Sequence, residues 1–114
     1  MIIAELVNAI NGRVVCGERM LQNEVEFAFA SDLMSDVLTI QSDGMMLLTG
    51  LANVQAVRTA EMSDVSCIVF VRNKKATPEM IELARENDTI LIECPYSMFK
   101  TSGILFQQGL KPVF

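Results

Sequence analysis

The sequence predicts an α/β fold built on a parallel β-sheet with βαβ crossovers. Three apolar runs, each followed by a turn and a helix-like segment, carry this prediction, and they lie at residues 45–48, 67–71 and 89–92. The segments expected to form the crossover helices lie at residues 53–62, 77–86 and 97–108. Continuous apolar strands separated by helices are typical of a parallel sheet that is covered on both faces.

The N-terminal part is expected to be a small helix and strand unit packed on this three-stranded parallel unit. One helical face is predicted to contain Ile2, Ile3, Leu6, Val7 and Ile10. Asn11-Gly12 supplies a left-handed stop for the helix. Residues 13–16 read as a short strand, and Gly17 is expected to turn the chain out of it.

Between residues 24 and 44 the pattern predicts a strand, a helix and a turn. Residues 24–29 alternate glutamates with Val25, Phe27 and Phe29, as in a strand with one wetter face. Ser31 is expected to cap a helix that runs from Asp32 to about Leu38. Residues 42–44, with the sequence Ser-Asp-Gly, predict a turn.

The last two predicted helices have distinct signals. Thr77-Pro78-Glu79 combines a capping hydroxyl, a proline at the first helical position and an acid near the positive helix end. Phe99, Gly103 and Phe106 lie on one face of the final helix. A helical glycine costs about 1 kcal/mol relative to alanine. We expect close approach of another backbone, in the same subunit or a second one, to offset that cost at Gly103.

Composition predicts one domain that forms a homodimer. The 114 residues suffice for a single domain covering residues 1–114, and 51% of them are hydrophobic. A domain of this size has little interior, so part of the apolar surface is expected to be buried against a second copy. A core filled by the eight methionines is the alternative.

The charge balance and the cysteines indicate a cytoplasmic protein that binds neither nucleic acid nor membrane. The formal net charge of −5 lacks the basic footprint of general nucleic-acid binding. The apolar runs are too short for a membrane span, and the N-terminus lacks the pattern of a signal peptide. Free thiols are expected, since the three cysteines are far apart and form no CxxC pair.

The sequence contains no histidine, which removes the commonest general base and the commonest metal ligand. Triads and dyads that need histidine are therefore impossible within this chain, and no P-loop is present. We expect no enzymatic activity, no cofactor and no bound metal.

Ligands of parallel sheets bind where the strands end and the helices begin. The residues expected to form a ligand site at this edge are Thr49, Gly50, Arg72, Asn73, Lys74, Lys75, Tyr96 and Ser97. Residues 72–75 form the only basic cluster of the chain and precede a helix N-terminus, where anions are attracted. An anion or a nucleotide is the expected ligand, and a solvated loop is the alternative.

Two further features have a functional and a structural interpretation. Asp32 and Asp36 are expected one turn apart on a helix, either as an acid pair or as ordinary helix charges; two carboxylates provide few ligands for a hard cation. Cys94 precedes a helix start, where a thiol pKa can fall, but a buried structural cysteine is favoured. Ser97 reads first as a helix cap, and Tyr96 as a residue that lines a pocket or stacks on a base.

Residues 31–110 resemble the DRTGG domain family. The motifs that carry the resemblance are the segments at residues 31–38, 48–50, 67–71, 77–79 and 95–101. The chain looks most like stand-alone members, which consist of this domain only. The resemblance implies an α/β fold similar to the non-catalytic N-terminal domain of HPr serine kinase. It also implies a regulatory or oligomerising role, since family members stand beside CBS domains or before phosphotransacetylase domains.

The sequence departs from the family at the motifs that give it its name. Leu51-Ala52 stands where the resemblance implies Asp-Arg after Gly50, and Arg72-Asn73-Lys74 stands where it implies Thr-Gly-Gly. Two functions remain open: a non-catalytic regulatory or assembly module acting as a homodimer, and a sensor of an anion or nucleotide. Some stand-alone bacterial members are found near iron-hydrogenase genes, which implies a role accessory to a hydrogenase or to another metabolic enzyme system.

Overall fold

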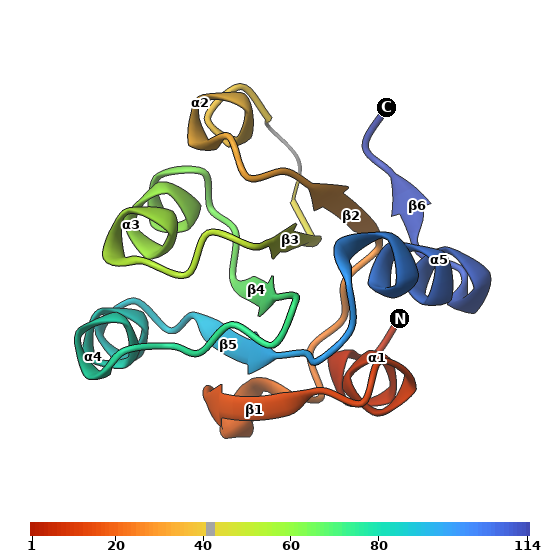
Figure 1. Cartoon of the computed structure of the whole chain (residues 1–114), viewed down its shortest axis with the longest axis horizontal. Coiled ribbons are helices and arrows are strands. Elements are labelled where there is room, and N and C mark those ends of the chain that lie inside the picture. Colours follow the sequence, from red (N-terminus) through yellow and green to blue (C-terminus); the bar gives the residue numbers. More distant parts are fainter. Residues whose placement is uncertain (41–42) are drawn as a thin grey trace.

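A six-stranded sheet in the order β1-β5-β4-β3-β2-β6 forms the centre of the computed structural model, which describes residues 1–40 and 43–114 (Figure 1). The strands are β1 Arg13–Cys16, β2 Phe27–Ala30, β3 Met45–Thr49, β4 Cys67–Phe70, β5 Ile90–Glu93 and β6 Lys111–Pro112. The helices are α1 Ile3–Ala9, α2 Met34–Val37, α3 Val54–Met62, α4 Pro78–Glu86 and α5 Met98–Gln108, with a 3₁₀ turn η1 at Glu18–Met20.

The parallel pairing predicted for the repeated strands is confirmed. Strand β4 pairs in parallel with both β3 and β5. The parallel part is larger than the expected three-stranded unit, because β2 and β6 join it beside β3. Only β1 among the described strands runs antiparallel, against β5. The N-terminal half therefore completes the sheet at both sides of the repeat instead of packing on it as a separate part.

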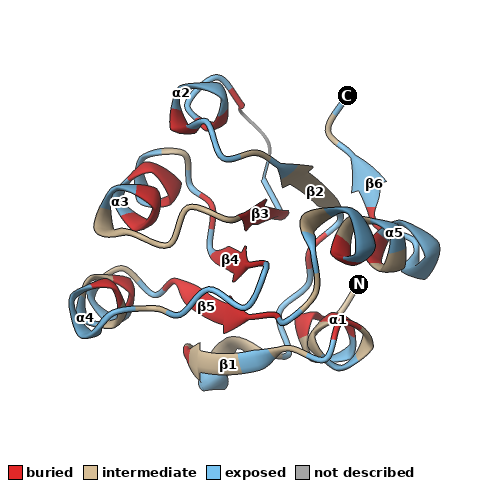
Figure 2. Ribbon diagram, viewed as in Figure 1, coloured by how far each residue is buried: buried red, intermediate tan, exposed pale blue. Residues whose placement is uncertain are grey.

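Helices cover both faces of the sheet, which explains why its central strands are apolar throughout. Helices α2, α3 and α4 lie on one face, and α1 and α5 lie on the other (Figure 1). Every residue of β3, β4 and β5 is buried (Figure 2). A strand with both faces covered has no wet side, so it reads as a continuous apolar run.

The expected strand at residues 24–29 is shorter and begins later. Strand β2 starts at Phe27, and Val25 packs in the opposite core from Phe27. The expected wetter face is present: Glu24 and Glu26 are exposed, whereas Val25 is buried and Phe27 and Phe29 are half-buried. Ala28 faces the α1 and α5 side, while Phe27 and Phe29 face the other. Alternating residues of a strand point to opposite faces, and helices occupy both sides.

The helix expected from Asp32 to Leu38 contains only Met34–Val37. Ser31 does not cap it; its hydroxyl accepts a hydrogen bond from the Leu33 backbone N–H at 3.0 Å. Serine can form such a local turn in place of a cap. Asp32 therefore lies in a loop. The turn predicted for residues 42–44 falls partly outside the described residues, because Ser42 is not among them.

The helix starts of the repeated part and the stop expected after the N-terminal helix are confirmed. The side chains of Asn53, Thr77 and Ser97 accept backbone hydrogen bonds at the N-termini of α3, α4 and α5 at 2.9 to 3.2 Å. At the end of α1, Asn11 adopts the left-handed conformation, with φ of 54°. These local signals place the helix N-termini of α3, α4 and α5 at the carboxyl ends of the parallel strands.

Candidate functional site

The carboxyl ends of the parallel strands bring the three predicted segments to one edge of the sheet. Thr49 ends β3 and Gly50 follows it, residues 72–75 follow β4, and Tyr96 and Ser97 follow β5. Backbone hydrogen bonds join neighbouring segments. The Val71 N–H donates to the Thr49 carbonyl at 3.0 Å, and the Arg72 N–H donates to the Tyr96 carbonyl at 2.7 Å.

Asp32 lies at this edge beside Thr49 and Gly50. Its Oδ1 accepts a hydrogen bond from the Gly50 backbone N–H at 2.6 Å and one from the Thr49 hydroxyl at 3.2 Å. The Thr49 hydroxyl oxygen in turn accepts from the Leu51 N–H at 3.1 Å. A carboxylate of the chain thus occupies the donors at the end of β3.

This arrangement corrects the interpretation of Asp32 and Asp36 as neighbours on a helix. Asp36 lies in α2, while Asp32 precedes the helix and faces the end of β3. The two carboxylates do not form a pair. Within residues 1–40 and 43–114, no group of three or more acidic, cysteine or histidine side chains could hold a metal ion.

The loop after β4 exposes the basic cluster and fixes its backbone. Arg72 and Asn73 both have φ of 60°, in the left-handed region that is unusual for a residue such as arginine. Their N–H groups donate to the carbonyls of Tyr96 and Cys94. The loop therefore presents the exposed side chains of residues 72–75 rather than free backbone N–H groups.

The Glu93 side chain anchors this loop through a hydrogen bond and an ion pair. The residue is 5% exposed at the end of β5, and its Oε2 accepts a hydrogen bond from the Ala76 N–H at 2.8 Å. The cationic groups of Lys75 and Arg13 lie 3.7 and 3.8 Å from its Oε1. Sequence reasoning missed Glu93, and it considered Asp32 only as a helix charge or as part of an acid pair. The available signal for Glu93 was a charged residue directly after the apolar run at residues 89–92.

Tyr96 and Ser97 directly precede α5, which begins at Met98. Ser97 caps the helix, as predicted. The Lys100 ammonium group lies 3.9 Å from the centre of the Tyr96 ring, within the range of a cation–π contact. The segment after β5 therefore contains one aromatic ring, Tyr96, and Lys100 already contacts it.

The cysteines are free and buried, as the sequence indicates. The Cys94 thiol donates to the Ile10 carbonyl at 3.2 Å and lies 3.4 Å from the Thr101 hydroxyl, which confirms its structural role. Burial raises the pKa of the Cys67 thiol to about 12 and also raises that of Cys16. Buried thiols with raised pKa values are poor nucleophiles.

A second surface follows α5. Phe99 is 91% exposed, Phe106 is 67% exposed, and a Cβ placed on Gly103 would meet no atom within 4 Å. We call these three residues the α5 apolar side. No backbone of the same chain approaches Gly103, so the part of the expectation that concerned the same subunit was wrong.

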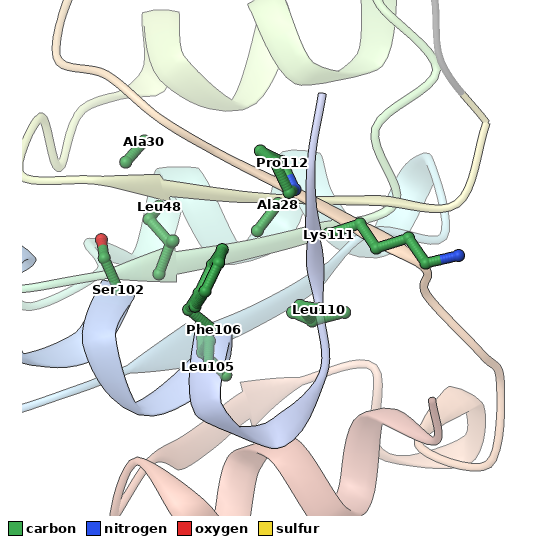
Figure 3. Close-up of a pocket in the computed structure, with 9 residues that line it drawn as sticks. All are labelled: Ala28, Ala30, Leu48, Ser102, Leu105, Phe106, Leu110, Lys111 and Pro112. Carbon is green, nitrogen blue, oxygen red and sulfur yellow. The ribbon is translucent and has the colours of Figure 1, made fainter. Parts of the chain in front are cut away.

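A cavity of about 170 Å³ adjoins the α5 apolar side (Figure 3). We call it the α5–β6 cavity; its walls come from β2, β3, α5 and β6 and include Ala28, Ala30, Ser102, Phe106 and Pro112. Figure 3 shows Ala28 and Ala30 of β2 on one side of the lining and Leu105 and Phe106 of α5 on the other. The cavity is open and mainly apolar because the short side chains of β2 leave that part of the sheet thinly covered.

No described helix is long and apolar enough to cross a membrane. A search of curated proteins finds no match to this chain. Among solved structures, the fold is similar to the CBS and DRTGG domains of the regulatory region of Clostridium perfringens pyrophosphatase, complexed with its activator diadenosine tetraphosphate. The TM-score is 0.72 at 15% identity, over 92% of this chain and 46% of that chain.

The neighbour shares the α/β fold, and this chain spans about half of its length. In the family comparison, the DRTGG domain matches residues 5–108, from α1 to the end of α5. The match includes all the strands except β6. The chain therefore belongs to the DRTGG domain family.

Proposed function

We propose that this chain is a non-catalytic regulatory or assembly module that acts as a homodimer through the α5 apolar side. The observation that carries the proposal is the pair of exposed phenylalanines, Phe99 and Phe106, on one side of α5 beside an open apolar cavity. Burying one phenylalanine side chain stabilises by about 1.5–3 kcal/mol. Two such residues from each copy supply a hydrophobic centre for a two-fold interface.

A regulatory role is further supported by the family and by the fold. The similar solved structure is a regulatory region of an enzyme. The chain lacks histidine and a P-loop, so it lacks the common means of proton transfer and phosphate transfer. ATP turnover that copurifies with the chain and is abolished by a point substitution would contradict this part of the proposal.

Light scattering at micromolar concentrations tests the homodimer. The wild-type chain is expected to give the mass of a dimer, and Phe106→Ser is expected to shift it toward the monomer. Met62→Ser is a matched control, because Met62 is also 67% exposed but lies at the end of α3 on the other face of the sheet. A monomer mass for the wild-type chain rejects the homodimer.

A second candidate function is a sensor that binds an anion or nucleotide at the carboxyl ends of the strands. It is favoured by the exposed cationic side chains of Arg72, Lys74 and Lys75 on one loop. The similar regulatory region is complexed with a dinucleotide polyphosphate. Thr49, Gly50, Asn73, Tyr96 and Ser97 would complete the rim, and in this role the chain would be accessory to a hydrogenase or another metabolic enzyme system.

The electrostatics of the edge restrict where such an anion would bind. The Asp32 carboxylate occupies the Gly50 N–H, so the anion would be held by side chains of the loop after β4. Substitution of Lys74 tests anion binding most specifically, since Lys75 also forms an ion pair with Glu93.

Thermal-shift measurements with ATP and diadenosine tetraphosphate test this second function. A ligand selective for the folded state raises its stability. Lys74→Ala is expected to reduce the shift. Lys111→Ala is the matched control, because Lys111 is an exposed lysine on β6, level with the first residue of β2 at the opposite edge. An equal loss in both variants would point to nonspecific charge attraction.

A further inference from the structure

We propose that Phe99 of each copy inserts into the α5–β6 cavity of the other copy, so that each cavity is completed only by the partner. This inference rests on the proposed homodimer and specifies which residue meets which surface. It predicts an antiparallel crossing of the two α5 helices about a two-fold axis near Ser102 and Gly103.

The size and chemistry of the α5–β6 cavity fit a phenyl ring. Its volume is about 170 Å³, and its walls are mainly the apolar side chains of Ala28, Leu48, Leu105, Phe106 and Pro112. An apolar cavity of about 150 Å³ accepts benzene in another protein. A benzyl side chain is therefore a suitable occupant, and a charged or strongly polar group is not.

The Phe99 side chain is not buried within its own chain. It is 91% exposed and stands in the first turn of α5. Phe114, which is 88% exposed, already packs edge-on against Phe29, with ring centres 6.2 Å apart. Phe29 packs in the core on the α2, α3 and α4 side, away from the cavity. Phe99 is thus the free aromatic group on the same helix as the cavity wall.

The spacing along α5 makes the surface self-complementary. Phe99 and Phe106 are seven residues apart, which is about two turns and roughly 10 Å along the helix. A two-fold axis midway between them passes between Ser102 and Gly103. Antiparallel pairing about that axis places Phe99 of one copy level with Phe106 of the other, at the wall of its cavity.

The residues at the crossing and the charges of α5 are compatible with this pairing. The space beyond the Gly103 Cα is open, which permits close approach of a second helix. Lys100 is the only charged residue between Met98 and Gln108. In the antiparallel pair it lies toward the C-terminal half of the partner's α5, and cations are stabilised near the negative end of a helix.

A complementation experiment tests the assignment. Phe99→Ala removes the inserted ring and leaves the cavity intact. Ala30→Leu fills the cavity from its β2 side and leaves Phe99 intact; Ala30 is exposed, so the monomer accommodates the larger side chain. Each variant alone is expected to raise the dimer Kd about a hundredfold, since both phenyl contacts are lost.

Mixing the two variants is the decisive measurement. In the heterodimer, Phe99 of the Ala30→Leu copy still meets the intact cavity of the Phe99→Ala copy. Sedimentation or native mass spectrometry, with one variant tagged, is expected to show heterodimers about tenfold tighter than either homodimer. Met62→Ala provides the control for loss of an exposed apolar side chain elsewhere, and circular dichroism verifies the fold of each variant.

The experiment distinguishes a failure of the Phe99 insertion from a failure of the homodimer. A wild-type monomer rejects both proposals. A wild-type dimer whose Kd is unchanged by Phe99→Ala, or variants that fail to recover as a heterodimer, overturns the insertion of Phe99 and leaves the homodimer standing. Preferential heterodimer formation supports the insertion.

Discussion

Oδ1 of Asp32 accepts a hydrogen bond from the Gly50 backbone N–H at 2.6 Å, which ties the loop after β2 to the end of β3. The two residues are eighteen positions apart in the sequence. A Cβ on Gly50 would stand 3.3 Å from the same carboxylate oxygen, tighter than most carbon contacts. The absence of a side chain at residue 50 and the carboxylate at residue 32 are thus fitted to each other.

Asp32→Ala is expected to lower the free energy of unfolding by about 1–2 kcal/mol, because the Gly50 N–H and the Thr49 hydroxyl lose their charged acceptor. Urea unfolding measures the change. Asp36→Ala removes the same charge from α2, where the side chain makes no described hydrogen bond, and is expected to stay within about 0.5 kcal/mol of wild type. Equal effects of the two changes would contradict a stabilising role for the hydrogen bonds of Asp32 to residues 49 and 50.

Lys75→Ala is expected to destabilise the fold by about 1 kcal/mol, since it removes one of the two cations paired with the buried Glu93 carboxylate. Lys74→Ala changes the same loop by one charge and is expected to leave the unfolding midpoint nearly unchanged. Thermal or urea unfolding of both variants, without ligand, provides the comparison. A larger loss in Lys74→Ala would show that Lys75 does not anchor the loop.

Gly103→Ala is expected to stabilise the monomer by about 0.5–1 kcal/mol, because alanine has the higher helix propensity and its Cβ meets no atom within 4 Å. The measurement uses the Phe99→Ala background, in which we expect the dimer to be weakened. Urea unfolding at low concentration gives the free energy. A destabilised variant would show that residue 103 has contacts within its own chain.

Stability is expected to fall at alkaline pH because of Cys67. Burial raises the pKa of this thiol from 9.0 to about 12, so the unfolded chain loses the proton first. The stabilisation is fully present below pH 9 and declines by roughly 1.4 kcal/mol per pH unit between pH 9 and 12. Urea unfolding between pH 8 and 10 is compared with that of Cys67→Ala, whose curve is expected to decline less. Parallel curves would exclude a contribution from this thiol.

Much of the fold was predictable because its strongest signals are local. Thr77-Pro78-Glu79 marks the start of α4 through a cap, a fixed φ and a favourable charge, and all act within one turn. The apolar run at residues 67–71 indicates a strand covered on both faces before any partner is known. Such signals failed at Ser31, whose hydroxyl satisfies a nearby backbone N–H without starting a helix.

The candidate ligand residues could be placed at one edge from the sequence, because parallel strands end at the same side of a sheet. The roles of Asp32 and Glu93 could not. The partners of Asp32 at residues 49 and 50 and those of Glu93 at residues 13 and 76 are distant in sequence. Pairing over such separations depends on strand order, which local patterns do not specify.

The sequence by itself determined the class of fold, the parallel repeat, the helix starts of that repeat and the absence of histidine chemistry, because these depend on periodicity, capping and composition. The tertiary structure decided that β2 and β6 extend the parallel sheet and that carboxylates occupy the strand ends. It also decided that Phe99 and Phe106 stay exposed beside a cavity. These features arise only when elements distant in the chain pack together, since burial and hydrogen-bond pairing belong to the assembled layers.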